Sequence, residues 1–298
     1  MTSRVAIEEH VVAGPDDGPY ALTTGPDGAL WFTMVRSGRV GRWVPGEEHT
    51  SHALDPASGP TVIVAGPDGA LWFTEYQAHR IGRLTVDGVL TEFPLPTPDS
   101  GPYGIATGPD GALWFTQTAA DRIGRIGVDG RVTEFPLPTT GAFPSAITAG
   151  PDGAMWFTLN QANAIGRIGT EGGITVHPLP TPAAGPVGIG ADRDAVWFVE
   201  IAAGQIGRIT PDGTVAEFPL PDRAARPHAI TAAADGTCWF TEWGRNRVGA
   251  IHPDATIEVH DLPPPHSEPH GITLGPDGAL WIALETGALA RCTTEGDR

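Results

Sequence analysis

One tryptophan recurs at a nearly constant spacing along the whole chain. The intervals between successive members of this series are 41, 42, 42, 41, 42 and 42 residues, and the series consists of Trp31, Trp72, Trp114, Trp156, Trp197, Trp239 and Trp281. A period of roughly 40–45 residues is typical of arrays in which each unit buries an apolar face against its neighbours. We therefore expect these seven tryptophans to pack between repeated units, and only Trp43 and Trp243 fall outside the series.

Each repeat carries the same series of short segments that favour strands and turns. In the third repeat these segments are 102–105 (PYGI), 108–111 (GPDG), 113–116 (LWFT), 123–126 (IGRI) and 133–138 (TEFPLP). Proline presets φ and Asp-Gly permits a positive φ, so the second segment has the chemistry of a turn. The other four read as strands, and no segment shows a sustained 3.6-residue apolar period. Four strands in each of seven repeats predict an all-β fold, a seven-bladed β-propeller with four-stranded blades.

The two ends of the chain predict how the ring closes. A third strand-like run, residues 288–292 (ALARC), follows Trp281, and no fourth run comes before Arg298. Residues 5–12 precede the first repeat and resemble the missing strand. We therefore expect an N-terminal strand to complete the last blade, which removes open sheet edges. Residues 1–298 are expected to form a single propeller domain.

Composition and charge exclude several classes of partner. The chain has 18 Lys and Arg against 35 Asp and Glu, and its formal net charge of −17 opposes phosphate backbones and anionic lipid. No run approaches the roughly 18 apolar residues of a membrane span. The first ten residues lack the pattern of a secretory signal, and 2 cysteines make no disulfide framework. We expect a cytoplasmic monomer that binds neither nucleic acid nor membrane.

Candidate functional residues are those that break the repeat at one position, because equivalent positions converge at the mouth of a propeller channel. The position after the opening proline is occupied by Tyr20, Thr61, Tyr103, Ser145, Val187, His228 and His270. The position before that proline is occupied by Gly18, Gly59, Gly101, Phe143, Gly185, Arg226 and Glu268. The last two repeats are charged there, and the first repeat neighbours the last on a closed ring. We expect Tyr20, His228, His270 and Glu268 to lie close together at the mouth of the channel.

A carboxylate that follows the last tryptophan extends this group. Three residues after each tryptophan the chain has Met34, Glu75, Gln117, Leu159, Glu200, Glu242 and Leu284, and in the last repeat the carboxylate is displaced to Glu285. Glu285 is expected to reach Glu268 within one blade. Two carboxylates with room for water suit a hard cation such as Mg²⁺. The remaining glutamates of this position, in contrast, are interpreted as solvated channel or inter-blade residues.

The repeat segments and three local segments together resemble the virginiamycin B lyase family. The local segments are 225–230 (ARPHAI), 240–244 (FTEWG) and 268–272 (EPHGI), and the similarity covers essentially all 298 residues. The resemblance implies an Mg²⁺-dependent carbon–oxygen lyase. Its substrate would be a small cyclic depsipeptide, a type B streptogramin, opened by elimination at its threonine ester without addition of water. Such an activity confers antibiotic resistance.

The resemblance also implies roles for individual residues. His270 matches the general base, Glu268 and Glu285 match the Mg²⁺ ligands, and His228 and Tyr20 match substrate-binding residues. It assigns no role to Arg226, Glu242 or Trp243. Two alternatives stay open, because one propeller fold carries many functions. These are a metal-dependent lactonase or other hydrolase, and a non-catalytic binding scaffold.

Overall fold

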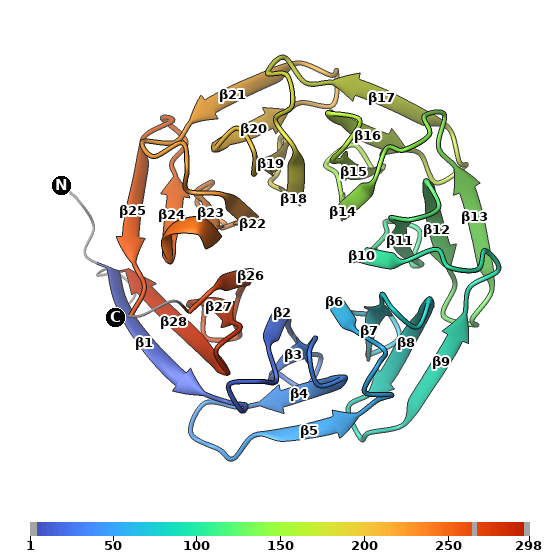
Figure 1. Ribbon diagram of the computed structural model, residues 1–298, viewed down its shortest axis with the longest axis vertical. Helices are drawn as coiled ribbons and strands as arrows, with labels where there is room; N and C mark the ends of the chain where they lie inside the picture. Colours follow the sequence, from blue (N-terminus) through green and yellow to red (C-terminus); the bar gives the residue numbers. More distant parts are fainter. Residues whose placement is uncertain (1–4, 264–266, 295–298) are drawn as a thin grey trace.

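A computed structural model describes residues 5–263 and 267–294, which form seven four-stranded antiparallel sheets arranged around a central axis (Figure 1). Each sheet is one blade. In blades one to six the strands run outward from the axis in chain order, and in blade seven the N-terminal strand lies outermost. The predicted seven-bladed propeller is confirmed. In the described part of the chain, no helix has the length and apolar character needed to cross a bilayer.

The strands fall into four concentric sets. The innermost strands of blades one to seven are β2 (Pro19–Thr24), β6 (Pro60–Ala65), β10 (Pro102–Thr107), β14 (Pro144–Ala149), β18 (Pro186–Ala191), β22 (Pro227–Ala232) and β26 (Pro269–Leu274). The second strands are β3 (Leu30–Met34), β7 (Ala70–Glu75), β11 (Leu113–Gln117), β15 (Met155–Leu159), β19 (Val196–Glu200), β23 (Cys238–Glu242) and β27 (Leu280–Leu284).

The two outer sets follow the same order. The third strands are β4 (Arg39–Trp43), β8 (Arg80–Thr85), β12 (Arg122–Ile126), β16 (Ala164–Ile168), β20 (Gln205–Ile209), β24 (Arg247–Ile251) and β28 (Ala288–Thr294). The outermost strands are β5 (Thr50–Ala53), β9 (Leu90–Pro94), β13 (Val132–Pro136), β17 (Ile174–Pro178), β21 (Val215–Pro219), β25 (Ile257–Asp261) and, in blade seven, β1 (Val5–Val11). A short 3₁₀ helix, η1 (Trp243–Arg245), follows β23.

The repeated turn sequence binds the tryptophan and the third strand of its own blade. In blade three, Asp110 accepts a hydrogen bond from Trp114 Nε1 at 3.0 Å and another from Arg125 Nε at 2.7 Å. Gly111 completes this turn with a φ of 73°, which a residue with a Cβ adopts only at a cost. The same Asp–Trp–Arg clamp recurs at Asp27, Asp68, Asp152 and Asp277. The clamp explains why the turn and the tryptophan recur together.

The tryptophans of the series pack between blades, as the sequence predicted. Trp114 of blade three is fully buried and lies in one apolar cluster with Ile147 and Phe157 of blade four. Large aromatic side chains contribute most to such cores because each removes a large area from water. Adjacent blades are therefore joined by apolar contacts between sheets.

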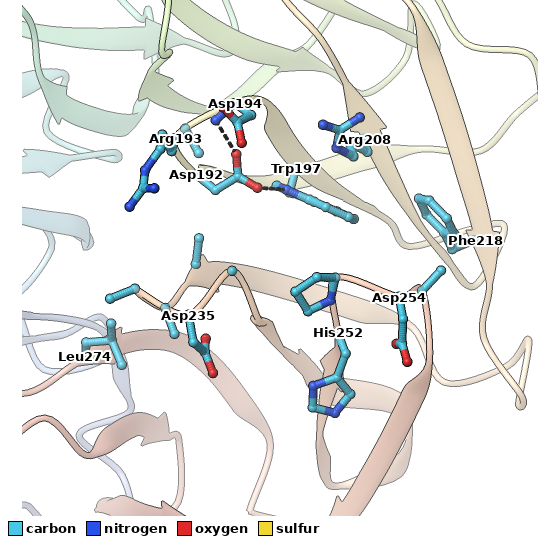
Figure 2. A pocket seen from close by; sticks show the side chains of 17 residues that line it. Asp192, Arg193, Asp194, Trp197, Arg208, Phe218, Asp235, His252, Asp254 and Leu274 are labelled. Carbon is cyan, nitrogen blue, oxygen red and sulfur yellow. Dashed lines mark hydrogen bonds between the residues drawn. The ribbon is translucent and has the colours of Figure 1, made fainter.

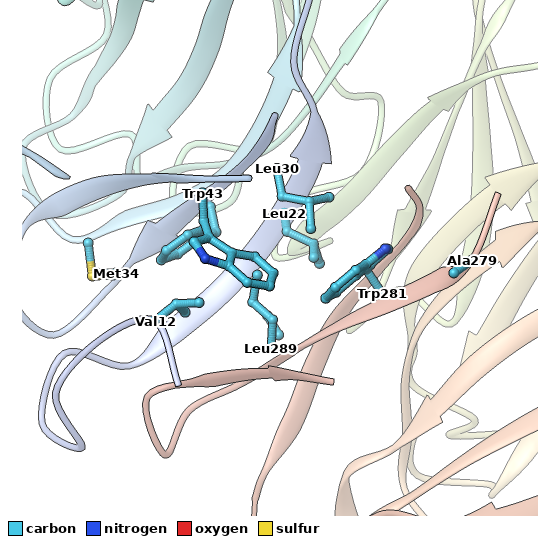
Figure 3. Close-up of a cluster of buried hydrophobic side chains, with 10 residues drawn as sticks. Val12, Leu22, Leu30, Met34, Trp43, Ala279, Trp281 and Leu289 are labelled. Atoms are coloured by element: carbon cyan, nitrogen blue, oxygen red, sulfur yellow. The ribbon is translucent and has the colours of Figure 1, made fainter. Parts of the chain in front are cut away.

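The N-terminal strand closes the ring. β1 pairs antiparallel with β28 over the register from Val5 opposite Thr294 to Val11 opposite Ala288, so the predicted closing strand is confirmed. Trp43 lies edge-on to Trp281, with ring centroids 5.5 Å apart, in a cluster that joins blades one and seven (Figure 3). Trp43 thus lies outside the tryptophan series but seals the junction between the first and last blades.

Threonine hydroxyls join the blades where the innermost strands begin. Thr74 Oγ1 donates to the carbonyl of Tyr103 at 2.6 Å, and Thr241 Oγ1 donates to the carbonyl of His270 at 2.9 Å. The same stretch of every innermost strand contains a register shift, as between Pro269 and Ile272. Such bulges redirect side chains and are common next to active sites. In five blades the residue after the opening proline therefore has its carbonyl held by a threonine hydroxyl at an irregular point of its strand.

Blades five and six depart from the regular clamp and border a cavity of about 960 Å³ (Figure 2). In blade five, Trp197 Nε1 donates to Oδ2 of Asp192 at 2.6 Å, the oxygen that meets arginine in the complete clamps. In blade six, Ala250 occupies the arginine position. The cavity includes Ala191 and Ala232, the last residues of β18 and β22. It therefore lies at the opposite ends of the innermost strands from the candidate residues.

The interpretation of Glu75, Glu200 and Glu242 as solvated or inter-blade residues is wrong. All three are fully buried at the ends of their second strands and bind the first residue of the third strand in their own blade. The partner of Glu200 is the neutral Gln205, at 2.6 Å. Burial raises the pKa of the Glu200 carboxyl to about 7, although this hydrogen bond favours the ionised form.

The raised pKa predicts a pH-dependent effect of Glu200→Gln. The folded chain disfavours the ionised carboxyl, so stability contributed by the neutral acid is lost as pH rises from about 4.5 to about 7. We expect E200Q to raise the free energy of unfolding by about 1–3 kcal/mol at pH 8, with a smaller gain at pH 5. Urea unfolding at both pH values measures the effect. Glu171→Gln removes the same charge from an exposed position and serves as the control. An equal gain from E200Q at both pH values would contradict the prediction.

Candidate active site

The residues that follow the opening prolines gather at one end of the central channel. Tyr20 on β2, Tyr103 on β10 and His228 on β22 line a cavity of about 290 Å³ enclosed by the innermost strands. His270 on β26 lies beside them. Its ring centroid is 4.7 Å from that of Tyr20 and 4.5 Å from that of His228, to which it is nearly perpendicular. The structure thus brings together the three aromatic residues that the sequence singled out.

Glu285 fixes the orientation of His270. His270 Nε2 lies 2.6 Å from Glu285 Oε1, and both side chains are almost entirely buried. Because a carboxylate accepts, Nε2 carries the proton, and the neutral imidazole then has its lone pair on Nδ1. Nδ1 is buried and has no hydrogen-bond partner among the described residues. His270 is therefore arranged as a base whose free nitrogen is Nδ1.

Glu268 occupies a strained backbone position. Its φ is 46°, whereas the glycines at the same position of four other blades have φ values between 58° and 66°. A side chain in this left-handed region costs roughly 1–2 kcal/mol, and such residues cluster at functional sites. Arg226 and Phe143, which also replace glycine in this position, have φ values of 51° and 54°. Arg226 and Glu268, the two charged residues that replace glycine at this position, thus lie in the blades that carry His228 and His270.

Arg36 joins the two carboxylates of blade seven across the ring closure. Its Nη2 lies 3.3 Å from Glu268 Oε2 and also contacts Glu285 Oε2. Glu268 and Glu285 therefore approach one another, as expected from the sequence, but they do so around a guanidinium that the sequence analysis missed. The residues five positions after each tryptophan are Arg36, Gln77, Ala119, Gln161, Ala202, Gly244 and Thr286. Comparison of the repeats at that position would have shown Arg36 as its one charged member.

The environment sets the charge of three site residues. Burial by itself would raise the pKa of the Glu285 carboxyl, but hydrogen bonds and charge from His270 and Arg36 lower it below its usual value. Desolvation, with the neighbouring His270, lowers the pKa of His228 to about 3. Burial, the adjacent Tyr103 and the charge of Glu285 raise the pKa of Tyr20 well above its usual value. At neutral pH Glu285 is an anion, His228 is neutral and Tyr20 keeps its proton.

A second tyrosine was missed, although it occupies the same repeat position as Tyr20. The Tyr20 and Tyr103 hydroxyl oxygens are 2.5 Å apart, and the Tyr20 hydroxyl lies 3.5 Å from His228 Nε2. These three groups form a chain of polar contacts across the channel. Tyr103 broke the repeat as plainly as Tyr20 did, so the same comparison could have selected it.

Trp243 and Arg226 form one wall of the site. The Trp243 ring lies 6.3 Å from that of His270, and the Arg226 guanidinium lies over the Trp243 ring at 5.6 Å. Trp243 Nε1 is buried and has no hydrogen-bond partner within residues 5–263 and 267–294. Trp243 thus contacts the candidate base, and Arg226 supports Trp243 from outside.

The donor set at Glu268 and Glu285 fits a hard divalent cation. Over the described ranges, no three His, Cys, Asp or Glu side chains form a ready-made metal cage. Mg²⁺ does not require one, because it keeps several waters and takes one or two carboxylates. The two glutamates already share one cationic nitrogen, so they can present oxygens to a common positive charge.

Comparison with curated proteins finds virginiamycin B lyases. The chain is 63% identical over 94 residues to virginiamycin B lyase from Saccharopolyspora erythraea, a stretch that covers 32% of this chain and 31% of that protein. It is 58% identical over 42 residues to virginiamycin B lyase from Streptomyces coelicolor, covering 14% of each. The matched stretches thus span less than a third of these curated relatives.

Comparison with solved structures extends over nearly the whole chain. A streptogramin B lyase structure has a TM-score of 0.94 and 44% identity, with 98% of both chains covered. A catalytically inactive histidine-to-alanine variant of virginiamycin B lyase from Staphylococcus aureus, crystallised with quinupristin, has a TM-score of 0.94 and 42% identity, with 97% of this chain and 99% of that chain covered. A putative gluconolactonase, at 14% identity and a TM-score of 0.64, shares the fold alone.

The model of the virginiamycin B lyase family matches residues 5–292. Because this match covers nearly all of the repeats and agrees with the structural relatives, the chain belongs to the virginiamycin B lyase family.

Proposed function

We propose that this chain is a streptogramin B lyase that opens a cyclic depsipeptide by elimination at its threonine ester and thereby confers antibiotic resistance. One observation carries the proposal. The Nδ1 atom of His270 is buried beside the channel cavity and has no hydrogen-bond partner among the described residues, and Glu285 binds the other ring nitrogen. The relative crystallised with quinupristin supports the substrate class, and its inactive variant supports a histidine as the base.

His270 would remove the α-proton of the substrate threonine. The electron pair of the Cα–H bond forms a double bond to Cβ, the Cβ–O bond breaks, and the ester oxygen leaves as a carboxylate. Nδ1 holds the proton, and Glu285 stabilises the resulting imidazolium because it accepts from Nε2. No water is added, so the linear product is an isomer of the substrate.

His228 and Tyr20 would bind the oxygens on which negative charge develops. His228 is neutral because its pKa is about 3, so one of its ring nitrogens carries a proton. Its Nδ1 is buried without a partner in the described part of the chain. Tyr20 keeps its proton because its pKa is raised. Donors already in place for the transition-state charge lower the barrier because they need no reorganisation.

Glu268 and Glu285 would hold Mg²⁺. When bound, this cation would act as a Lewis acid toward substrate oxygen. The strained backbone of Glu268 supports a functional role for that carboxylate, because a glycine would hold the same turn at lower cost. A cytoplasmic location and a monomeric state stay predictions of the sequence.

Replacement of the base tests the reaction. We expect His270→Ala to lower ring opening of a type B streptogramin by about 10²–10⁴-fold, because the α-proton then has no positioned acceptor. Mass spectrometry of the wild-type product should show an unchanged mass, and absorbance should report the new alkene. His177→Gln, a change at a histidine stacked on Trp156 in blade four, is the control. A product heavier by one water would favour the hydrolase, and full activity of H270A would refute the assigned base.

The low pKa of His228 predicts how replacement of this residue affects the pH dependence of the reaction. His228 loses its proton near pH 3, so it does not change charge between pH 5 and pH 9. We expect His228→Gln to lower kcat/KM by about 10–100-fold through loss of a hydrogen bond to substrate, without moving the acid limb of the pH–rate profile. The measurement is kcat/KM across that range for both proteins. A displaced acid limb would show that His228 titrates in the reaction.

Removal of one carboxylate tests the cation. We expect Glu268→Gln to need at least about tenfold more Mg²⁺ for half-maximal activity, because an ionised ligand is replaced by a neutral one. Activity is measured against Mg²⁺ concentration after EDTA treatment. The exposed Glu171→Gln change controls for the loss of one negative charge. Unaltered activity of the wild-type chain in excess EDTA would contradict a metal requirement.

A further inference from the structure

We propose that Arg36 is a tethered cation whose guanidinium holds Glu268 and Glu285 together in the metal-free protein. A divalent cation that binds the two glutamates displaces this guanidinium, so Arg36 weakens metal binding. This inference rests on the metal site of the proposed function. Arg36 is not among the site residues that the sequence resemblance implies.

The position of Arg36 allows it to move. Arg36 follows β3 in blade one, whereas both glutamates belong to blade seven, so its contact crosses the seam of the ring. Its backbone N–H is fixed to the carbonyl of Asp17 at 3.1 Å. Its side chain passes over Gly18, where a Cβ would lie only 3.0 Å from Arg36 Cγ. The side chain is nonetheless 47% exposed, so the guanidinium can turn into solvent while its backbone stays in place.

The two oxygens of the Glu285 carboxylate determine which of its contacts a bound cation would break. Glu285 Oε1 binds His270 and Glu285 Oε2 binds Arg36, so both oxygens of this glutamate are occupied. Releasing Oε1 would free His270 from the group that orients it. Releasing Oε2 moves only the half-exposed Arg36 guanidinium, which water can solvate in place of the carboxylate. A cation that binds Glu285 therefore displaces Arg36 and leaves His270 in place.

Charge gives the direction of the effect. Two carboxylates with Arg36 between them carry a net charge of about −1, and without Arg36 they carry about −2. A dication is attracted more strongly to the second arrangement. The same change leaves two like charges facing one another in the metal-free protein, which is destabilising. Loss of Arg36 should therefore tighten metal binding and weaken the metal-free fold.

The test compares Arg36→Met with Arg39→Met. Both changes remove one positive charge and keep a long side chain, but Arg39 binds Ser51 rather than the glutamates. Isothermal titration with Mg²⁺ alone and thermal unfolding with and without Mg²⁺ are measured for both variants and wild type. We expect R36M to bind Mg²⁺ about tenfold more tightly, to have a lower Tm without metal and to gain more from Mg²⁺. R39M should match wild type in its affinity for Mg²⁺.

The outcomes separate this inference from the proposed function. Equal or weaker Mg²⁺ affinity in R36M would overturn the role of Arg36, and so would the absence of Mg²⁺ binding by either protein. Ring opening by the wild-type chain, measured by mass in parallel, tests the lyase by itself. Tighter binding by R36M together with no ring opening by wild type would support the tethered cation and overturn the lyase.

Discussion

Hydrogen bonds from threonine hydroxyls to the next blade hold the innermost strands in the positions on which the site depends. Thr241 binds the carbonyl of His270 and thereby fixes the backbone of the candidate base from blade six. The threonine belongs to the repeated Trp-Phe-Thr segment, so the element that builds the core also aligns the channel. The catalytic geometry is therefore a consequence of how neighbouring blades join.

Two junctions lack this threonine, and both adjoin site residues. Val199 occupies the position in blade five, before His228, and Ala283 occupies it in blade seven, before Tyr20. At both junctions the neighbouring backbones pack closely, because a Cβ would collide with the carbonyl oxygen of His228 if placed on Gly188 and would lie 2.8 Å from that of Tyr20 if placed on Gly271. The carbonyls of Tyr20 and His228 thus lack the threonine of the preceding blade, whereas Thr33 and Thr241 of their own blades bind the backbone N–H of the residue that follows each of them.

The charged part of the site lies on the seam where the ring closes. From His270 through Glu285 and Arg36 to Glu268, each ionic or hydrogen-bonded contact leads to the next. Three of these residues belong to blade seven and the fourth to blade one. Closure of the ring by β1 therefore does more than cover a sheet edge, since it brings the candidate base, the two carboxylates and the guanidinium of Arg36 to one place.

The sequence alone determined the period, the four strands of each blade, the closing strand and the repeat position from which Tyr20, His228 and His270 come. It could do so because turn chemistry and alternation are local properties of the chain. Only the tertiary structure showed that Glu285 orients His270, that Arg36 lies between the two glutamates and that Glu200 is buried. These facts depend on side-chain directions at bulges and across the junction of the first and last blades, which no periodicity along the chain specifies.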